Sequence, residues 1–254
     1  MMKVRGPGSY LAILVLFGAQ VAAAFEPTPL HLARGARIGV VSALEPDITH
    51  FHSGRSLQDA FLHTERLNWS TGAMLLDTLK ERVAQMGLVL VPLGVTTELN
   101  RARETCFLNG NFNKGLPKDC VPAFEHLGSE DQVQAVIVLA PGLNNSAHAG
   151  SSRRKELPEY VRGWGFMTGT AGAPDGKPAL FSMTELLLVA PSPDGPALHA
   201  REWGGNYELE WSSFVPPPDL KAIPIPDYGE LKPLVAGLLG RQTSRLLDQI
   251  QIGP

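Results

Sequence analysis

Three histidines close to a carboxylate could together bind a metal ion. His50, His52, Asp59 and His63 lie within one short stretch of the chain. Residues two apart on a β-strand face the same way, so His50 and His52 could direct their imidazoles at one ion. His63 or Asp59 could complete three ligands, and nitrogen ligands favour zinc. Zinc would lower the pKa of a bound water, which is the chemistry of a metal-assisted hydrolase.

The same histidine pattern also occurs on ordinary strand faces, where imidazoles are solvated or pack against aromatic rings. No H-E-x-x-H sequence accompanies these histidines. We therefore favour a strand and its exit loop over a metal site, and we expect no cofactor. The alternative is a metal-assisted hydrolase that uses His50, His52 and a nearby carboxylate, with zinc as its cofactor.

A polar loop after the third apolar run is a candidate binding site. It contains Asn144, Asn145, Ser146 and His148. In open α/β sheets, ligands bind beyond the carboxyl ends of the parallel strands, where this loop is expected to lie. No G-x-S-x-G sequence is present to expose a nucleophilic serine. The loop therefore predicts binding rather than a hydrolase triad.

An Arg-x-Trp pattern occurs twice, at Arg162 and Trp164 and at Arg201 and Trp203. On a strand, each Arg could lie over its own Trp ring. The two pairs could form a platform on which a ligand stacks. A pair of structural edge strands is the interpretation that we favour, with the platform as a candidate binding site.

The N-terminus has the pattern of a secretory signal peptide. Lys3 and Arg5 precede an apolar run at 11–17, and the small residues 21–24 provide an Ala-x-Ala cleavage site. The run is shorter than the roughly 20 apolar residues that span a bilayer, although an uncleaved anchor is the alternative. We expect residues 1–24 to be removed and the protein to be periplasmic or secreted, with no membrane span after cleavage.

The chain has two cysteines, Cys106 and Cys120. In an oxidising compartment such a pair is expected to form a disulfide. The bridge would close a loop rich in Asn, Gly and Lys, and would contribute roughly 3 kcal/mol in the chain-entropy model. A metal-binding or redox pair is the alternative, and the spacing is unlike C-x-x-C.

Apolar runs predict a sheet with a parallel centre. The segments 36–44, 88–93 and 133–140 read as buried strands. A helix between the first two begins at Asn68 or Ser70 and carries its apolar stripe up to Gly87. Strands that alternate with helices are typical of the α/β class.

Other segments add strands and a last helix. The segment 48–52 is expected to pair with 36–44 as a hairpin. Strands at 161–167, 180–190 and 197–203 are expected as an antiparallel extension at one edge; the turn sequence PSPDGP joins the last two. A helix over 230–249 should pack on the body. We predict a single α/β domain over residues 25–254.

Composition excludes some classes of function. The formal net charge of −3 gives no broad basic surface, so a nucleic-acid partner is not expected. P-loop, G-x-G-x-x-G and C-x-x-C sequences do not occur. A small molecule or an envelope protein is the expected partner.

The opening strand RIGVVSAL, followed by a polar loop with Asn68 and Trp69 that leads into a helix, resembles uncharacterised bacterial exported (periplasmic) α/β proteins. Strands that alternate with helices and end in a long amphipathic helix are also similar to periplasmic envelope-assembly accessory domains. The resemblance implies a small α/β fold and brings no known activity. From the residues and this resemblance we expect an exported, non-enzymatic binding or envelope-interaction module.

Overall fold

The computed structural model describes residues 28–53, 59–107, 112, 115–125, 127, 131–142, 161–169, 178–204 and 209–253. Its strands are β1 (Leu30–Leu32), β2 (Arg37–Ser42), β3 (Asp47–Ser53), β4 (Phe61–Arg66), β5 (Val89–Pro92), β6 (Ala135–Pro141), β7 (Gly163–Gly169), β8 (Ala179–Ser192), β9 (Gly195–Trp203), β10 (Leu209–Glu210) and β11 (Ile250–Ile252). Its α-helices are α1 (Thr71–Gln85), α2 (Thr97–Ala102), α3 (Val121–Phe124) and α4 (Leu231–Leu247). The short helical segments are the π-helix η1 (Arg103–Phe107) and the 3-10 helices η2 (Lys118–Cys120) and η5 (Ile225–Glu230).

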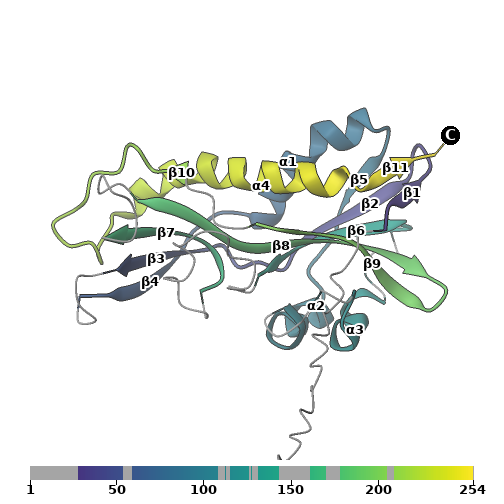
Figure 1. Ribbon diagram of the computed structural model, residues 1–254, viewed down its shortest axis with the longest axis horizontal. Coiled ribbons are helices and arrows are strands. Elements are labelled where there is room, and N and C mark those ends of the chain that lie inside the picture. The colour runs from purple at the N-terminus through teal and green to yellow at the C-terminus, as the bar shows by residue number, and fades with distance from the viewer. Residues whose placement is uncertain are drawn as a thin grey trace, which may run out of the picture.

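A long mixed sheet organises the molecule, and β8 runs through its middle (Figure 1). Along one edge of β8, its first half pairs with β7 and its second half with β6, both antiparallel. The other edge pairs with β10 and then with β9. Most of β8 is buried, which explains its nearly continuous apolar sequence. The α/β class with a mixed sheet is therefore confirmed.

The predicted parallel centre is present, because β2 pairs in parallel with both β5 and β6. The predicted hairpin between β2 and β3 is wrong. Both hydrogen-bonding edges of β2 are occupied by β5 and β6, so the chain passes through residues 43–46 and forms β3 farther along the sheet. There β3 pairs antiparallel with β4 and parallel with β7.

The second half of the chain differs in part from the predicted edge extension. The β8–β9 hairpin is confirmed, and its turn brings Ser192 opposite Gly195. The strand β7 is not purely antiparallel, since it also pairs in parallel with β3. The strand β8 is central rather than peripheral, because it has partners along both edges. A further strand, β4, was not predicted.

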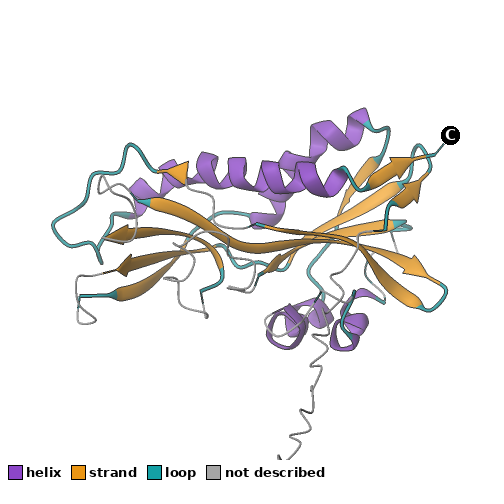
Figure 2. Cartoon of the chain, in the orientation of Figure 1, coloured by secondary structure: helices purple, strands orange, loops and turns teal. Residues whose placement is uncertain are grey.

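Helices cover both faces of the sheet (Figure 2). The long helices α1 and α4 lie on one face and contact each other. Ser70 caps α1 by accepting a hydrogen bond from the backbone N–H of Ala73, as one of the two predicted cap residues. The side chains that face the sheet are Leu75, Leu79 and Val83 of α1 and Leu231, Val235, Leu238, Leu239, Leu246 and Leu247 of α4. Of the helices in the described ranges, none is long and apolar enough to cross a membrane.

The small helices α2 and α3 lie on the opposite face (Figure 1). Cys106 and Cys120 lie at disulfide-bonding distance, with their Cα atoms 5.1 Å apart. Cys120 directly precedes α3, so the bridge ties the start of α3 to the end of η1. Both cysteines are buried with Phe107 and Phe124 in an apolar cluster beneath β6 and β8. The bridge thus holds two short helical segments against the sheet.

Candidate functional site

The histidine cluster lies on the α4 side of the sheet, where β3, β4 and β7 run next to one another. The register places His50 opposite His63 on β4 and opposite Phe166 on β7. Two residues further along β3, His52 lies opposite Thr168 on β7. The alternation along β3 thus directs His50 and His52 to the same face, as predicted.

The two imidazoles share the hydroxyl group of Thr168. The Nε2 atom of His50 lies 2.7 Å from Thr168 Oγ1, and the Nδ1 atom of His52 lies 2.8 Å from the same oxygen. A hydroxyl group has one proton, so it can donate to one ring and must accept from the N–H of the other. His50 also stacks on Phe166, with ring centroids 4.4 Å apart, and His52 stacks on Phe61 at 5.1 Å.

Burial keeps His50 uncharged. Its pKa is lowered from 6.5 to about 3 by desolvation first and then by the nearby His52 and His63, and the backbone of Leu220 opposes the shift. Desolvation also lowers the pKa of His52, whereas the charge of Asp59 raises it. The cluster is therefore a neutral hydrogen-bonded group among aromatic rings rather than an exposed strand face.

The residues predicted as metal ligands are not arranged around one point. His63 lies 3.4 Å from the carboxylate of Glu65, and Asp59 is exposed in the turn before β4. Within the part of the chain that is described, no three His, Cys, Asp or Glu side chains form a group that could hold a metal ion. His50 and His52 come together on Thr168, whereas His63 and Asp59 do not join them there.

The two Arg-x-Trp pairs lie on different faces. Trp164 pairs with Ser182 and Trp203 with Glu185, and two residues three apart on β8 face opposite ways. Trp164 is buried in the same core cluster as the apolar side chains of α4, and Trp203 packs on the other face against the cluster that contains Met183. The two tryptophans therefore do not form a single stacking platform.

The arginines of these pairs have partners other than tryptophan. Arg201 Nη2 lies 3.2 Å from Glu185 Oε1, and its guanidinium lies 6.0 Å from the ring centroid of Phe112. Arg162 donates a hydrogen bond to the carbonyl oxygen of Val161. The predicted loop site at Asn144, Asn145, Ser146 and His148 lies outside the described residues, as does the signal peptide over 1–24.

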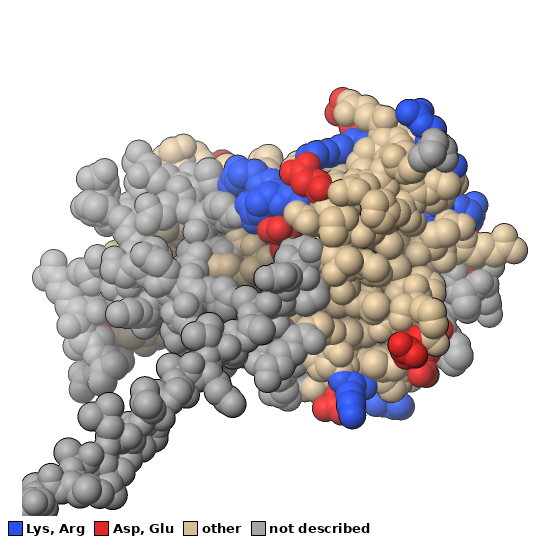
Figure 3. All heavy atoms as spheres, turned by 45° about the vertical axis from the view of Figure 1, so that its right-hand side comes forward, with Lys and Arg blue, Asp and Glu red and all other residues tan. Residues whose placement is uncertain are grey.

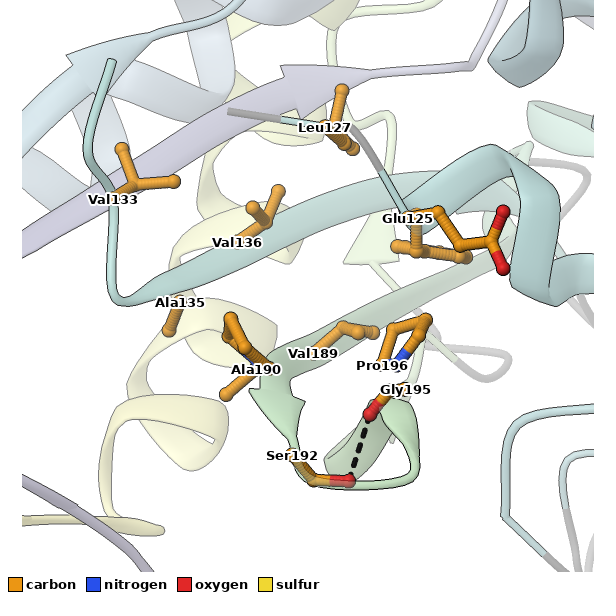
Figure 4. A pocket seen from close by; sticks show the side chains of 12 residues that line it. Glu125, Leu127, Val133, Ala135, Val136, Val189, Ala190, Ser192, Gly195 and Pro196 are labelled. Atoms are coloured by element: carbon orange, nitrogen blue, oxygen red, sulfur yellow. Dashed lines mark hydrogen bonds between the residues drawn. The ribbon is translucent and has the colours of Figure 1, made fainter. Parts of the chain in front are cut away.

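An apolar pocket lies between α3 and the β8–β9 hairpin; we call it the hairpin pocket (Figure 4). Its volume is about 290 Å³. Its lining residues are Phe124, Glu125, Leu127, Val133, Ala135, Val136, Val189, Ala190, Pro191, Ser192, Gly195 and Pro196. Most of these are apolar, which is typical of sites that hold small molecules. The pocket has no signature in the sequence, because four separate chain segments form it and none carries a motif.

Few polar side chains line the hairpin pocket. The hydroxyl group of Ser192 donates a 2.7 Å hydrogen bond to the carbonyl oxygen of Gly195 across the hairpin turn. The exposed carboxylate of Glu125 lies at the margin and points away from Val133 and Val136 (Figure 4). The disulfide has a role here, because it holds the start of α3, which ends at Phe124 in the pocket wall.

The end of the sheet that bears the β8–β9 hairpin carries charges of both signs (Figure 3). Figure 3 turns the end of the sheet that bears the β8–β9 hairpin toward the reader, and basic and acidic side chains there form small mixed groups around a broad uncharged area. A second, more open hollow of about 480 Å³ is lined in part by His31, Arg34 and Gln134, and shares Ala190 and Pro191 with the hairpin pocket. Two adjoining hollows thus lie at this end of the sheet.

Comparison with known proteins brings no relative, since no family model, curated protein or solved structure matches the chain. The resemblance to uncharacterised bacterial exported α/β proteins therefore stays a prediction. What the fold and the site define is an α/β protein with an apolar pocket at one end of its sheet.

Proposed function

We propose that this protein is a non-enzymatic binding protein whose hairpin pocket holds a small apolar molecule. The observation that carries the proposal is the concentration of apolar side chains around a preformed space of about 290 Å³. An apolar molecule that fills such a pocket removes apolar surface from water, which lowers the free energy. The alternative, a metal-assisted hydrolase, gains no support from the described residues, because His50 and His52 meet at the hydroxyl group of Thr168 and form no group there that could hold a metal ion.

The volume sets the size of the ligand. An apolar cavity of about 150 Å³ holds benzene, so the pocket accommodates roughly ten non-hydrogen atoms. Each buried methylene contributes about 0.8 kcal/mol, which corresponds to about a fourfold change in Kd. A ligand series of increasing chain length therefore measures the pocket directly.

We expect straight-chain alcohols from hexanol to dodecanol to bind the purified mature protein. Kd should fall about fourfold per methylene and level off near ten non-hydrogen atoms, where the pocket is full. Isothermal titration calorimetry measures this series. Absence of saturable binding for every alcohol would contradict the proposal.

A variant that fills the pocket provides the specific control. Val133 lines the pocket and is only half-buried, so Val133→Phe adds about four non-hydrogen atoms there without compressing the sheet. The chain length at which Kd levels off should shorten by about four atoms. The matched control is Val95→Phe, because Val95 is 44% exposed and is not part of the lining. An unchanged length profile in Val133→Phe would reject this pocket as the site.

We also propose that the chain is exported to the periplasm or secreted, with cleavage before Phe25. Support comes from the basic residues and apolar run of the N-terminus and from Cys106 and Cys120 at disulfide-bonding distance. We expect N-terminal sequencing of the protein recovered from the periplasm or medium to begin at Phe25. A chain recovered only from the cytosol with its first 24 residues attached would overturn this proposal.

A further inference from the structure

The hairpin pocket has an electrically asymmetric margin. Its lining includes one charged residue, Glu125, and no Lys, Arg or His. Among the residues that the structure describes, none forms an ion pair or hydrogen bond with the Glu125 side chain. A carboxylate without a partner at the edge of an apolar site can accept a cation.

A second carboxylate adjoins the pocket lining in sequence. Asp194 is exposed in the hairpin turn, between the lining residues Ser192 and Gly195. Neither its side chain nor that of Glu125 is neutralised by a described cation. Glu125 directly follows α3, and Asp194 lies in the turn that joins β8 to β9.

We infer that the hairpin pocket selects ligands whose apolar chain ends in a positively charged amine. This inference rests on the proposed function, because it assigns the chemical class of the molecule held in the same pocket. The alkyl chain would occupy the space among Val133, Val136 and Val189, and the ammonium group would remain at the margin beside Glu125. An alkyl carboxylate of the same length would place like charges together and bind less tightly.

The direction of the Glu125 side chain is compatible with a ligand ammonium group that stays hydrated (Figure 4). The Glu125 carboxylate points outward from the valine side chains in Figure 4, so an ammonium group can meet it without losing its hydration. An ion pair in such an exposed position contributes modestly. From exposed pairs measured elsewhere, the expected preference for the amine over the alcohol is about two- to fivefold in Kd.

Three probes of equal chain length test the inference: 1-nonanol, nonylamine and nonanoate. Nonylamine is protonated near neutral pH, as a lysine side chain is. Calorimetry at low salt should give the tightest binding for nonylamine and the weakest for nonanoate. Added salt should reduce the differences, because it screens exposed charges.

Substitutions at Glu125 and Asp194 show which carboxylate causes the preference for nonylamine. Glu125→Gln should remove most of the preference for nonylamine, read as the ratio of the Kd values of nonylamine and 1-nonanol within the same variant, and Glu125→Lys should invert the order of amine and carboxylate. Adding Asp194→Asn to Glu125→Gln should remove the remaining preference. The matched control is Glu81→Gln, since Glu81 lies on α1 across the sheet. It should bind all three probes as the unmodified protein does.

The outcomes separate the two proposals. Saturable binding of 1-nonanol with equal Kd for the amine and the carboxylate would overturn the inference and leave the apolar pocket as the binding site. Absence of binding for all three probes would overturn both. A preference for nonylamine that persists in the Glu125→Gln/Asp194→Asn variant would place the cation elsewhere and so reject the inference.

Discussion

Replacement of Arg201 by methionine is expected to lower the free energy of unfolding by about 3 kcal/mol or more near neutral pH. Glu185 is 5% exposed, and Arg201 lies 3.2 Å from its Oε1 atom. Oε2 is buried without a hydrogen-bond partner. Removal of the guanidinium therefore leaves a buried carboxylate without its counter-charge, which costs more than the pair itself contributes. Urea denaturation followed by circular dichroism measures the loss.

The pH dependence distinguishes this mechanism from a simple loss of packing. Burial raises the pKa of Glu185, and the charge of Arg201 opposes that shift. A carboxyl group with a raised folded-state pKa binds its proton more tightly in the folded protein, so its stabilising contribution is present at low pH and lost as pH rises. The deficit of Arg201→Met should therefore shrink as the solution is acidified. A deficit that is equal at all pH values would indicate lost packing alone.

The double variant Glu185→Gln/Arg201→Met completes the experiment. Without the carboxylate, no unpaired charge is buried, so the double variant should be more stable near neutral pH than Arg201→Met. The coupling energy from the double-mutant cycle then measures the interaction of the two side chains. A double variant less stable than both single variants would contradict a buried ion pair as the cause.

Elements with a strong local pattern could be predicted from the sequence. The runs that form β2 and β6 are apolar because helices cover both faces of the sheet there, whereas β5, predicted as a buried strand, lies at the edge with Val89 exposed. The turn that contains Asp194 joins β8 to β9 as its sequence indicates. The pattern of α4 placed Leu239 on the buried stripe. The local sequence pattern is sufficient to predict such elements.

Elements that depend on distant partners could not be predicted. The segment FLHTER forms β4 although it is polar and partly exposed along its length, because β3 offers it an edge. His50 and Thr168 are 118 residues apart in sequence, and no local pattern reveals their hydrogen bond. Trp211 and Tyr228 pack on Phe166 beside the histidine cluster. Both residues come from a part of the chain far from β3 in sequence.

The candidate sites follow the same division. Sequence spacing correctly placed His50 and His52 on one face, since strand periodicity is local. The hairpin pocket needs α3, the start of β6 and the β8–β9 hairpin to meet at one end of the sheet. Only the three-dimensional arrangement brings Glu125 close to the hairpin pocket, so no sequence pattern indicated a role for Glu125 in binding.

Acidification is expected to destabilise the protein through His50. Its pKa is about 3 in the folded protein against 6.5 for an exposed histidine. The unfolded chain therefore binds more protons between these values, and the stabilising contribution, complete above the unfolded pKa, is lost as pH falls. The two pKa values correspond to a loss of about 2 kcal/mol near about pH 5 and about 3 kcal/mol near about pH 4. Urea denaturation at a series of pH values measures this loss.

The variant His50→Phe isolates the histidine from the other acid-sensitive groups. Phenylalanine keeps an aromatic ring against Phe166 and cannot take up a proton, so the variant should lose less stability on acidification than the unmodified protein, even if loss of the bond to Thr168 lowers its stability near neutral pH by about 1 kcal/mol. His31→Phe, at an exposed position on β1, is the matched control. In addition, the NMR signals of the His50 ring should not titrate until well below the range of an exposed histidine. A His50 ring that titrates near neutral pH, or a His50→Phe variant with an unchanged pH profile, would show that burial does not hold this imidazole neutral.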